Sequence, residues 1–245
     1  MSYQEFKPNI NLLPFIDSYW TLKTDNPKPL NYLKMPNGLN DVLIVLGDNF
    51  KTETGNPILE NEHTYLTGIK THSVNITQQK NINLIGISFK AGAFSHFHKF
   101  DSLSFIKDKI VELNNNFVPN FDLLFNNDIK NTLDTFYLRK LVLQEDIHLK
   151  IANEIEVNKG QIRIREITKK YPITDRQLER VFKEKIGLSP KEFINLTRFQ
   201  YALNEIKNRA SKKSLLEIAF DCGYYDHSHL SNEIKKYSGI TPSQL

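Results

Sequence analysis

The feature that most constrains how this chain can fold is an internal repeat near its C-terminus. The segments 174–193 and 226–245 align without a gap at an offset of 52 residues. Apolar positions match apolar positions, glycine matches glycine, and Ser189-Pro190 matches Thr241-Pro242. A repeat of this kind copies one supersecondary unit, so the identity of that unit decides the architecture of the whole region.

The first copy predicts a helix, a tight turn and a second helix. The first helix must end before Pro172, because proline cannot continue a helix. Thr174 with Gln177 three residues later predicts a capping box at the start of the second helix. Gly187 is expected just beyond its end, where helices favour a left-handed residue. A helix-turn-helix unit is therefore expected over 162–186.

A long helix and the second copy follow. Ser189-Pro190 with Glu192 combines an N-cap, a first-turn proline and a capping-box partner, so three start signals agree. Apolar residues then keep a helical period, which predicts a linker helix over 189–208, roughly 30 Å long. The second unit is expected over 214–238. Its two helices would repeat the pattern of the first pair.

Two helix-turn-helix units joined by a long helix resemble the DNA-binding module of the AraC/XylS transcription regulators. Spacing and residue type agree over both units, across about the last 85 residues. The resemblance implies that the second helix of each unit enters the major groove of DNA. The matching segments are Thr174–Phe182, Gly187–Phe193, Ile218-Ala219, Gly223-Tyr224, Ser228–Leu230 and Gly239–Pro242.

The same resemblance implies which side chains contact DNA. Arg can bond guanine bidentately, Asn can bond adenine, and Glu can accept from cytosine. The expected base-reading side chains are Asp175, Arg176, Glu179, Arg180, His227, Ser228, Ser231 and Asn232. Lysines nearby are expected to contact phosphates, which position a protein without specifying sequence. These are Lys183, Lys185, Lys191, Lys212, Lys213, Lys235 and Lys236.

One residue departs from the family pattern. Asn232 stands where the family often carries Arg, whereas Arg180 holds the matching place in the first unit. We therefore expect the second unit to be the less basic of the two. Two recognition helices on one rigid spacer are expected about one turn of DNA apart, ~34 Å.

The distribution of charge along the chain is consistent with a DNA-binding module in the C-terminal part, but it is not sufficient to identify one. Residues 151–245 carry 17 Lys and Arg against 12 Asp and Glu, whereas residues 1–150 carry 15 against 16. A basic surplus in one region is typical of a nucleic-acid module, yet a surplus of this size is also ordinary for a soluble domain. Cys222 is the only cysteine, so no intrachain disulfide forms, and we expect a buried apolar role for it.

No signal-peptide pattern opens the chain, and no apolar run approaches the ~20 residues of a membrane helix. A cytoplasmic location without membrane contact is expected.

Residues 1–145 predict a β-rich mixed domain, and residues 146–245 an all-α domain, so the expected fold class is α+β. Strand signals occupy 18–23, 40–47, 65–69, 74–77 and 82–90, with a polar loop over 49–62 and helices over 121–125, 129–138 and 146–157. The segments Met35–Ile44, Gly68–His72 and Gly86–Ala93 resemble a sensor-like N-terminal domain found in one branch of AraC-type regulators. That resemblance implies a β-rich domain with an uncharacterised ligand, and a cupin-like sugar-binding barrel is the alternative.

The N-terminal part offers aromatic and histidine candidates for a site. Trp20, Tyr65, Phe94 and Phe97 are candidates for an effector pocket, although such aromatic groups are more often packed core. Four histidines are candidate metal ligands, with solvated or packed side chains as the alternative: His63, His72, His96 and His98. They lack ligand spacing, so neither a metal nor a cofactor is expected. No nucleotide-binding or hydrolase motif is present, so no enzyme is expected.

These observations favour a sequence-specific transcription factor that binds double-stranded promoter DNA and works with RNA polymerase. Its N-terminal domain would bind a small-molecule effector or form a homodimer. Two other functions stay open. One is a ligand-binding or enzymatic N-terminal domain with a vestigial DNA-binding module. The other is a helical protein–protein scaffold, which would carry apolar outward faces where this chain has polar ones.

Overall fold

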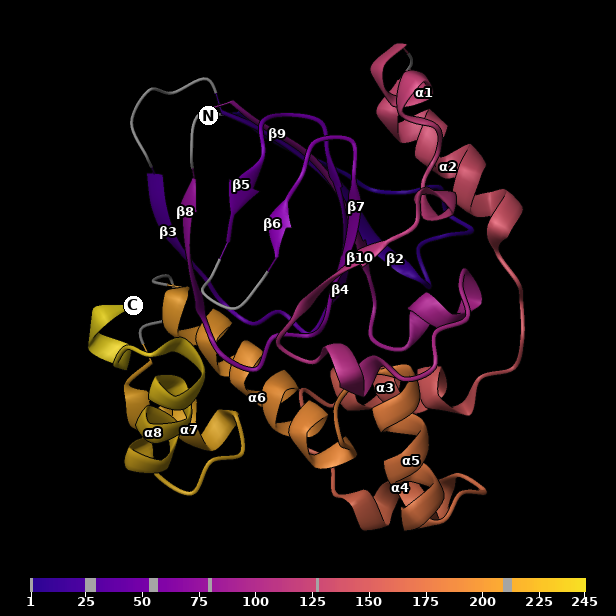
Figure 1. Cartoon of the computed structure of the whole chain (residues 1–245). Helices are drawn as coiled ribbons and strands as arrows, with labels where there is room; N and C mark the ends of the chain where they lie inside the picture. The colour runs from indigo at the N-terminus through magenta and orange to yellow at the C-terminus, as the bar shows by residue number, and fades with distance from the viewer. Residues whose placement is uncertain (1, 25–29, 53–56, 79–80, 127, 209–212) are drawn as a thin grey trace.

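The computed structural model describes residues 2–24, 30–52, 57–78, 81–126, 128–208 and 213–245. Strands occupy the first half of the chain and helices the second (Figure 1), which confirms the α+β class. The strands are β1 (Ser2–Phe6), β2 (Ile16–Thr24), β3 (Leu30–Lys34), β4 (Asn40–Val45), β5 (Phe50–Lys51), β6 (Ile58–Leu59), β7 (Thr64–Thr67), β8 (Val74–Gln78), β9 (Ile82–Phe89) and β10 (Ile110–Leu113).

The α-helices are α1 (Phe121–Asn126), α2 (Ile129–Lys140), α3 (Ile147–Val157), α4 (Ile164–Lys170), α5 (Asp175–Lys185), α6 (Pro190–Lys207), α7 (Leu215–Asp221) and α8 (His227–Ser238). Short 3-10 turns are η1 (Ala93–His96), η2 (Leu103–Ile106), η3 (Asn115–Phe117) and η4 (Pro242–Gln244).

A six-stranded antiparallel sheet in the order β1-β2-β9-β4-β7-β10 organises the N-terminal half. Side chains alternate along a strand, so a central strand supplies two cores. On β4, Val42 and Ile44 pack on one face, and Leu43 and Val45 pack on the other. Because both faces of β4 are buried, its apolar residues form a continuous run instead of alternating with polar ones.

The two faces of the sheet are covered differently. One face packs against η1, η2 and α2, with Phe94, Leu103 and Tyr137 in its core. The other packs around Tyr65 and Phe50, beside a separate two-stranded sheet of β3 and β8. The sequence did not predict β1, β3 or β10, and the hairpin of β5 and β6 lies inside the segment expected to be a loop.

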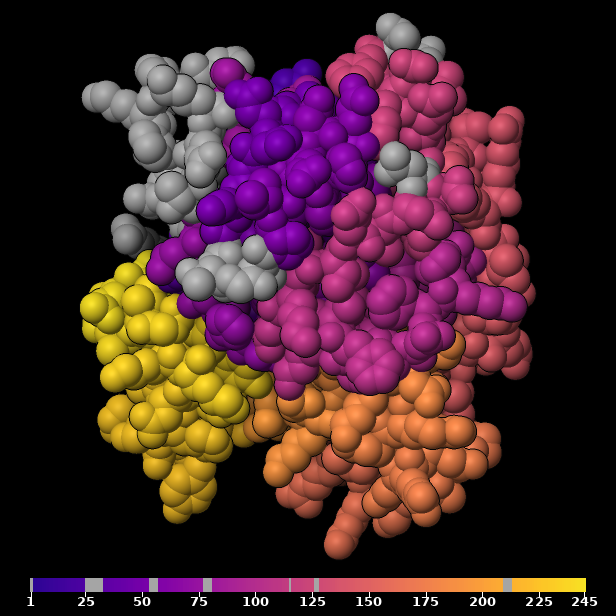
Figure 2. Space-filling model, in the orientation of Figure 1, coloured from indigo at the N-terminus to yellow at the C-terminus, as the bar shows by residue number. Residues whose placement is uncertain are grey.

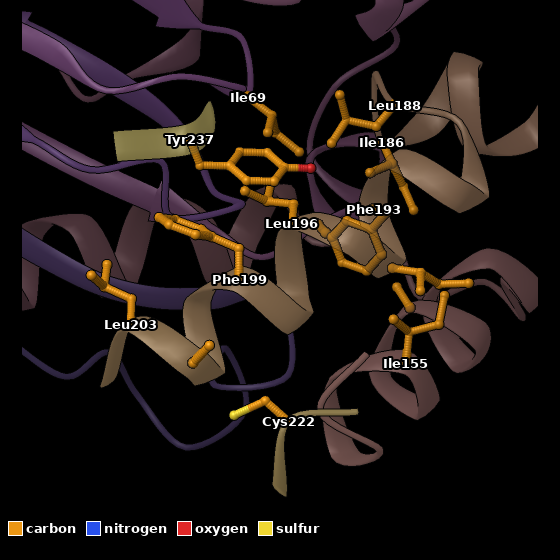
Figure 3. Close-up of a cluster of buried hydrophobic side chains, with 14 of the residues drawn as sticks. Ile69, Ile155, Ile186, Leu188, Phe193, Leu196, Phe199, Leu203, Cys222 and Tyr237 are labelled. Atoms are coloured by element: carbon orange, nitrogen blue, oxygen red, sulfur yellow. The ribbon is translucent and has the colours of Figure 1, made fainter. Parts of the chain in front are cut away.

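The helical half surrounds a third core, which Figure 3 shows in close-up. The caps expected at α5 and α6 are present as reciprocal capping boxes, and α7 has a third, between Ser214 and Glu217. The linker helix α6 has 18 residues and is therefore about 27 Å long. Cys222 is buried in this core, as its sequence position predicted.

The third core is shared between the two halves of the chain. Ile69 and Ala91, from the strand-rich half, are 1% and 2% exposed among the helices. Figure 3 shows Ile69 among the buried side chains of the helical core. The C-terminal helices are therefore docked on the β-rich half.

Hydrogen bonds join the halves as well. The Ser73 amide donates to the Tyr237 carbonyl, and its Oγ donates to the Ser238 carbonyl, both over 2.7 Å. Lys107 Nζ donates to Glu192 Oε1 over 2.6 Å. The Lys107 and Ser189 hydrogen bonds outweigh burial, which alone would raise the pKa of Glu192, and hold that pKa at about 2. The start of α6 and the end of α8 are thus both attached to the β-rich half.

Candidate nucleic-acid interface

The first helix-turn-helix unit consists of α4, a short turn and α5. Leu178 and Phe182 are fully buried and hold α5 against the core. Thr174 caps the helix by accepting a hydrogen bond from the Gln177 amide over 3.3 Å. Packing on one side leaves the opposite face of α5 outward. Of the predicted base-reading residues there, Asp175, Arg176 and Arg180 are exposed, and Glu179 is half-buried.

The ion pairs on this face divide its cationic residues into two groups. Lys183 pairs with Glu179 over 3.0 Å, a partly exposed i,i+4 pair that contributes roughly 0.5 kcal/mol. In the described part of the chain, Arg176 and Arg180 have no carboxylate within ion-pair distance. The two arginines of α5 can therefore bind a nucleic acid without first breaking an internal pair.

The second unit consists of α7, a turn and α8. Asp226 caps α8 by accepting from the His229 amide over 2.7 Å, and Leu230 and Ile234 are fully buried. The outward face carries four predicted residues. His227, Ser228 and Asn232 are exposed, and Ser231 is half-buried. Ser231 Oγ donates to the carbonyl of His227 over 2.7 Å, so its hydrogen is used within the helix and its lone pairs remain for DNA.

The predicted phosphate contacts are not equivalent. Lys183, Lys191, Lys213, Lys235 and Lys236 are exposed, and Lys185 is half-buried. Lys212 lies outside the described residues. Lys213 donates to Asp221 over 2.7 Å, and this hydrogen bond raises the pKa of Lys213.

Contacts within the helical half fix how the two units face each other. Arg198, in the middle of α6, donates from Nε and Nη2 to the Gly160 carbonyl over 3.1 and 2.9 Å. Its guanidinium also lies 5.7 Å from the centroid of the Tyr224 ring. Gln161 Nε2 donates to the Asp221 carbonyl over 2.8 Å. The turn before the first unit therefore contacts the second.

The arrangement leaves the two units at opposite ends of α6 (Figure 1). In Figure 2 they form separate lobes below the β-rich half, with a recess between them. Such a pair of recognition helices on one spacer can contact two stretches of one DNA face.

One exposed residue near the interface was not predicted. Tyr225 is 84% exposed in the turn directly before α8, whereas its neighbour Tyr224 is buried. The repeat could have found it, because the offset of 52 pairs Tyr225 with Ile173, directly before the cap of α5. An aromatic ring at this place can contact the sugar–phosphate backbone beside the recognition helix.

The four candidate effector residues do not line one pocket. Trp20 and Tyr65 belong to one face of the sheet. Phe94 and Phe97 belong to the core on the opposite face. Trp20 and Tyr65 are strand residues that point to one face, whereas Phe94 and Phe97 belong to η1 and its C-cap, which pack on the other face. Aromatic composition alone does not reveal that separation.

The histidines are dispersed. His63 lies 3.7 Å from Glu112, His72 3.4 Å from Asp108, and His96 2.9 Å from Asp146, whereas His98 packs on a phenylalanine ring. Among the residues that the structure describes, no three His, Cys, Asp or Glu side chains are grouped to hold a metal ion. None of the described helices is both long and apolar enough to cross a bilayer.

Two family models match the chain. One described as a helix-turn-helix domain matches residues 167–245, and one described as a domain of unknown function (DUF6597) matches residues 4–112. The activator RhaS of Mannheimia succiniciproducens is 30% identical over 80 residues, 33% of this chain and 29% of that protein. An uncharacterized helix-turn-helix regulator of Haemophilus influenzae is 37% identical over 65 residues, 26% of this chain and 21% of that protein. The chain therefore spans less than a third of the length of these relatives.

Solved structures extend the likeness to the whole fold. ToxT of Vibrio cholerae superposes with a TM-score of 0.53 at 14% identity, covering 100% of this chain and 97% of ToxT. ToxT bound to an unsaturated fatty acid gives 0.51 at 13% identity, covering 91% of this chain and 92% of that one. At such identities the likeness concerns the fold alone. The repeated helix-turn-helix units, the helix-turn-helix domain match over residues 167–245 and the fold shared with ToxT support an AraC/XylS-type regulator with an N-terminal domain.

Proposed function

We propose that this protein regulates transcription by binding promoter DNA in a sequence-specific manner. The observation that carries the proposal is the pair of capped helices α5 and α8 at the ends of one α6, each with polar, exposed outward residues. Arg176 and Arg180 would supply base contacts in the first unit, and Asn232 with His227 in the second. The exposed lysines would contact phosphates.

The division of labour belongs to the same proposal. Residues 1–145 would form the sensor or dimerisation domain, and 146–245 the DNA-binding domain. The packing of α3 with α5 and α6 supports the boundary before α3. A small-molecule effector and RNA polymerase are the proposed partners, in the cytoplasm, with a homodimer as the proposed assembly. ToxT, of the same fold, has been solved with an unsaturated fatty acid, which supports an effector of some kind.

The alternative is a ligand-binding N-terminal domain with a vestigial DNA-binding module. The arginines on α5 have no carboxylate within ion-pair distance among the residues that the structure describes. This favours the regulator, because both guanidinium groups remain available to bind a nucleic acid.

The test is a binding titration of the full chain on its own upstream DNA and on a scrambled duplex, across a salt series. A regulator binds its own DNA more tightly, and the logarithm of its affinity falls linearly with the logarithm of salt. Equal, weak binding to both duplexes would contradict sequence-specific recognition.

A matched pair of variants controls the experiment. Arg176→Ala removes an exposed arginine of α5, whereas Arg139→Ala removes an arginine of α2, on the opposite half of the protein. We expect weaker specific binding only for the first. Equal losses in both variants would point to a general charge effect.

A further inference from the structure

A cavity of about 330 Å³ lies on one face of the six-stranded sheet. Strand register explains which residues meet there. Trp20 of β2 stands opposite Glu5 of β1 on one side and Gly86 of β9 on the other. Ser88 stands opposite Asp41 of β4. Side chains directly opposite one another share a face, so four strands contribute to one wall.

Trp20 is held in position by its surroundings. Its indole packs directly against Gly86, where a Cβ would lie 2.0 Å from the ring atom Cε2. Its Nε1 donates to Ser88 Oγ over 3.1 Å, and Ser88 Oγ donates to Asp41 Oδ1 over 2.6 Å. The ring of Tyr3 lies beside it, with centroids 6.3 Å apart. The cavity thus has an aromatic wall, in which Trp20 is held by its neighbours and Tyr3 lies beside it on the edge strand β1.

The charges around the cavity are mainly negative. Glu5, Asp17 and Asp41 line it, together with one cation, Lys34. Lys34 is already paired with the buried Asp41 over 2.9 Å. Glu5 and Asp17 are near the opening, where the exposed Lys7 approaches them over 3.8 and 3.5 Å. A cation entering the cavity would replace Lys7 as the partner of two carboxylates.

The aromatic wall and these carboxylates together match one kind of ligand. An organic cation is attracted to the face of Trp or Tyr, and methylated ammonium groups are bound in this way. A cavity of this volume suits a small molecule. A carboxylate ligand would instead meet three like charges and a lysine that is already engaged.

The segment Lys34–Leu39 connects the cavity to the DNA-binding half. Lys34, Asn37 and Leu39 line the cavity. The residues between them turn the other way: Met35 packs on the helical core, the Pro36 carbonyl accepts from Gln200 Nε2 of α6 over 3.4 Å, and Gly38 lies against the same glutamine. One short segment therefore touches both the cavity and the linker helix between the two recognition helices.

We propose that this cavity is the effector site, that its ligand is a small organic cation bearing an alkylated ammonium group, and that the Lys34–Leu39 segment passes its occupancy to α6. The effector role rests on the proposed function, whereas ligand binding can be tested without DNA. A ligand acts on DNA binding only by favouring one arrangement of α6 over another.

Trp20 is the only tryptophan of the chain, so the fluorescence of the full protein reports on the cavity. We would titrate choline, its neutral carbon isostere dimethylbutanol, and the fatty acid oleate. We expect a saturable change with choline at least about ten-fold tighter than with dimethylbutanol, from the cation–π and carboxylate contacts. Comparable binding of the neutral isostere, tighter binding of oleate, or no saturable change with choline would each overturn the ligand class.

Two variants locate the binding. Glu5→Gln combined with Asp17→Asn should weaken choline binding about ten-fold and leave binding of the isostere unchanged. Glu112→Gln, an exposed carboxylate on β10 at the far edge of the same sheet, is the matched control. Equal affinity for choline in both proteins would remove the cavity carboxylates from the site.

Gln200→Ala tests the connection to α6. Hydrogen exchange of α6 amides should change on adding choline to the wild type and should not change in the variant, while its choline affinity stays the same. A variant that responds like the wild type would overturn the role of the segment. If neither the wild type nor the variants bind DNA, the proposed function is refuted. The fluorescence and exchange experiments would still test ligand binding and its effect on α6, because they do not use DNA.

Discussion

The ion pair of Lys107 and Glu192 allows a quantitative test of how firmly the two halves are docked. The two oxygens of Glu192 have separate partners. Oε1 accepts from Lys107, and Oε2 accepts from Ser189 in the capping box of α6. Glu192→Gln keeps an oxygen for the cap and removes the charge, and Lys107→Met removes the partner. A double-mutant cycle on these two changes isolates the contact between halves.

The size of the coupling follows from the pKa of Glu192. A carboxyl whose pKa falls from 4.5 to about 2 contributes roughly 3 kcal/mol at neutral pH when water is excluded. The Glu192 side chain is 43% exposed, and Ser189 causes part of the shift. Because water screens this partly exposed pair, we expect the interaction of Glu192 with Lys107 to contribute about 1 kcal/mol to the free energy of unfolding.

Urea unfolding of the four proteins measures this coupling energy. Because the folded-state pKa is depressed, the contribution is fully present above the unfolded value of 4.5 and is lost as pH falls toward 2. We expect about 1 kcal/mol at neutral pH and a clear decrease at about pH 3. A coupling near zero at neutral pH, or one that does not change on acidification, would refute this account of docking.

Three further changes address the DNA-binding half. Arg180→Ala should cost about 1–3 kcal/mol of specific binding, measured against Arg139→Ala, and an unaltered binding curve in a folded variant would remove Arg180 from the base contacts. Gly223→Val should lower the thermal midpoint, because φ is +72° and a Cβ would lie 3.1 Å from Gln161 Oε1; an unchanged melt would contradict that. Lys191→Ala should reduce the slope of log affinity against log salt by about one, and an equal slope would show that Lys191 does not neutralise a phosphate.

Local signals were enough to predict the helical half. Each capping box needs only two residues three positions apart, such as Thr174 and Gln177. The structure shows these two residues forming the predicted reciprocal hydrogen bonds. The helical spacing of apolar residues was also enough to predict the exposed faces of α5 and α8, because Leu178 and Leu230 mark the buried side of each helix. These contacts lie within one turn of the chain.

Features that depend on distant pairing were not predictable. The residues of β1 are exposed or half-buried, so no apolar pattern marks the strand, which exists because it pairs with β2. Ser73 and Ser238 meet across 165 residues of sequence. Trp20 and Phe94 are on opposite faces of a sheet whose register no single-sequence pattern supplies.

The burial of Ile69 and Ala91 among the helices has a consequence for exchanging parts between related regulators. A chimera joined near residue 145 would present the helical half with side chains from a different β-rich partner at these two places. Unless the donor carries residues of similar volume there, the graft leaves a hole or a clash in a core that otherwise excludes water. A β-rich half from another protein should therefore be compatible with this helical half only when its side chains at these two positions match Ile69 and Ala91 in volume.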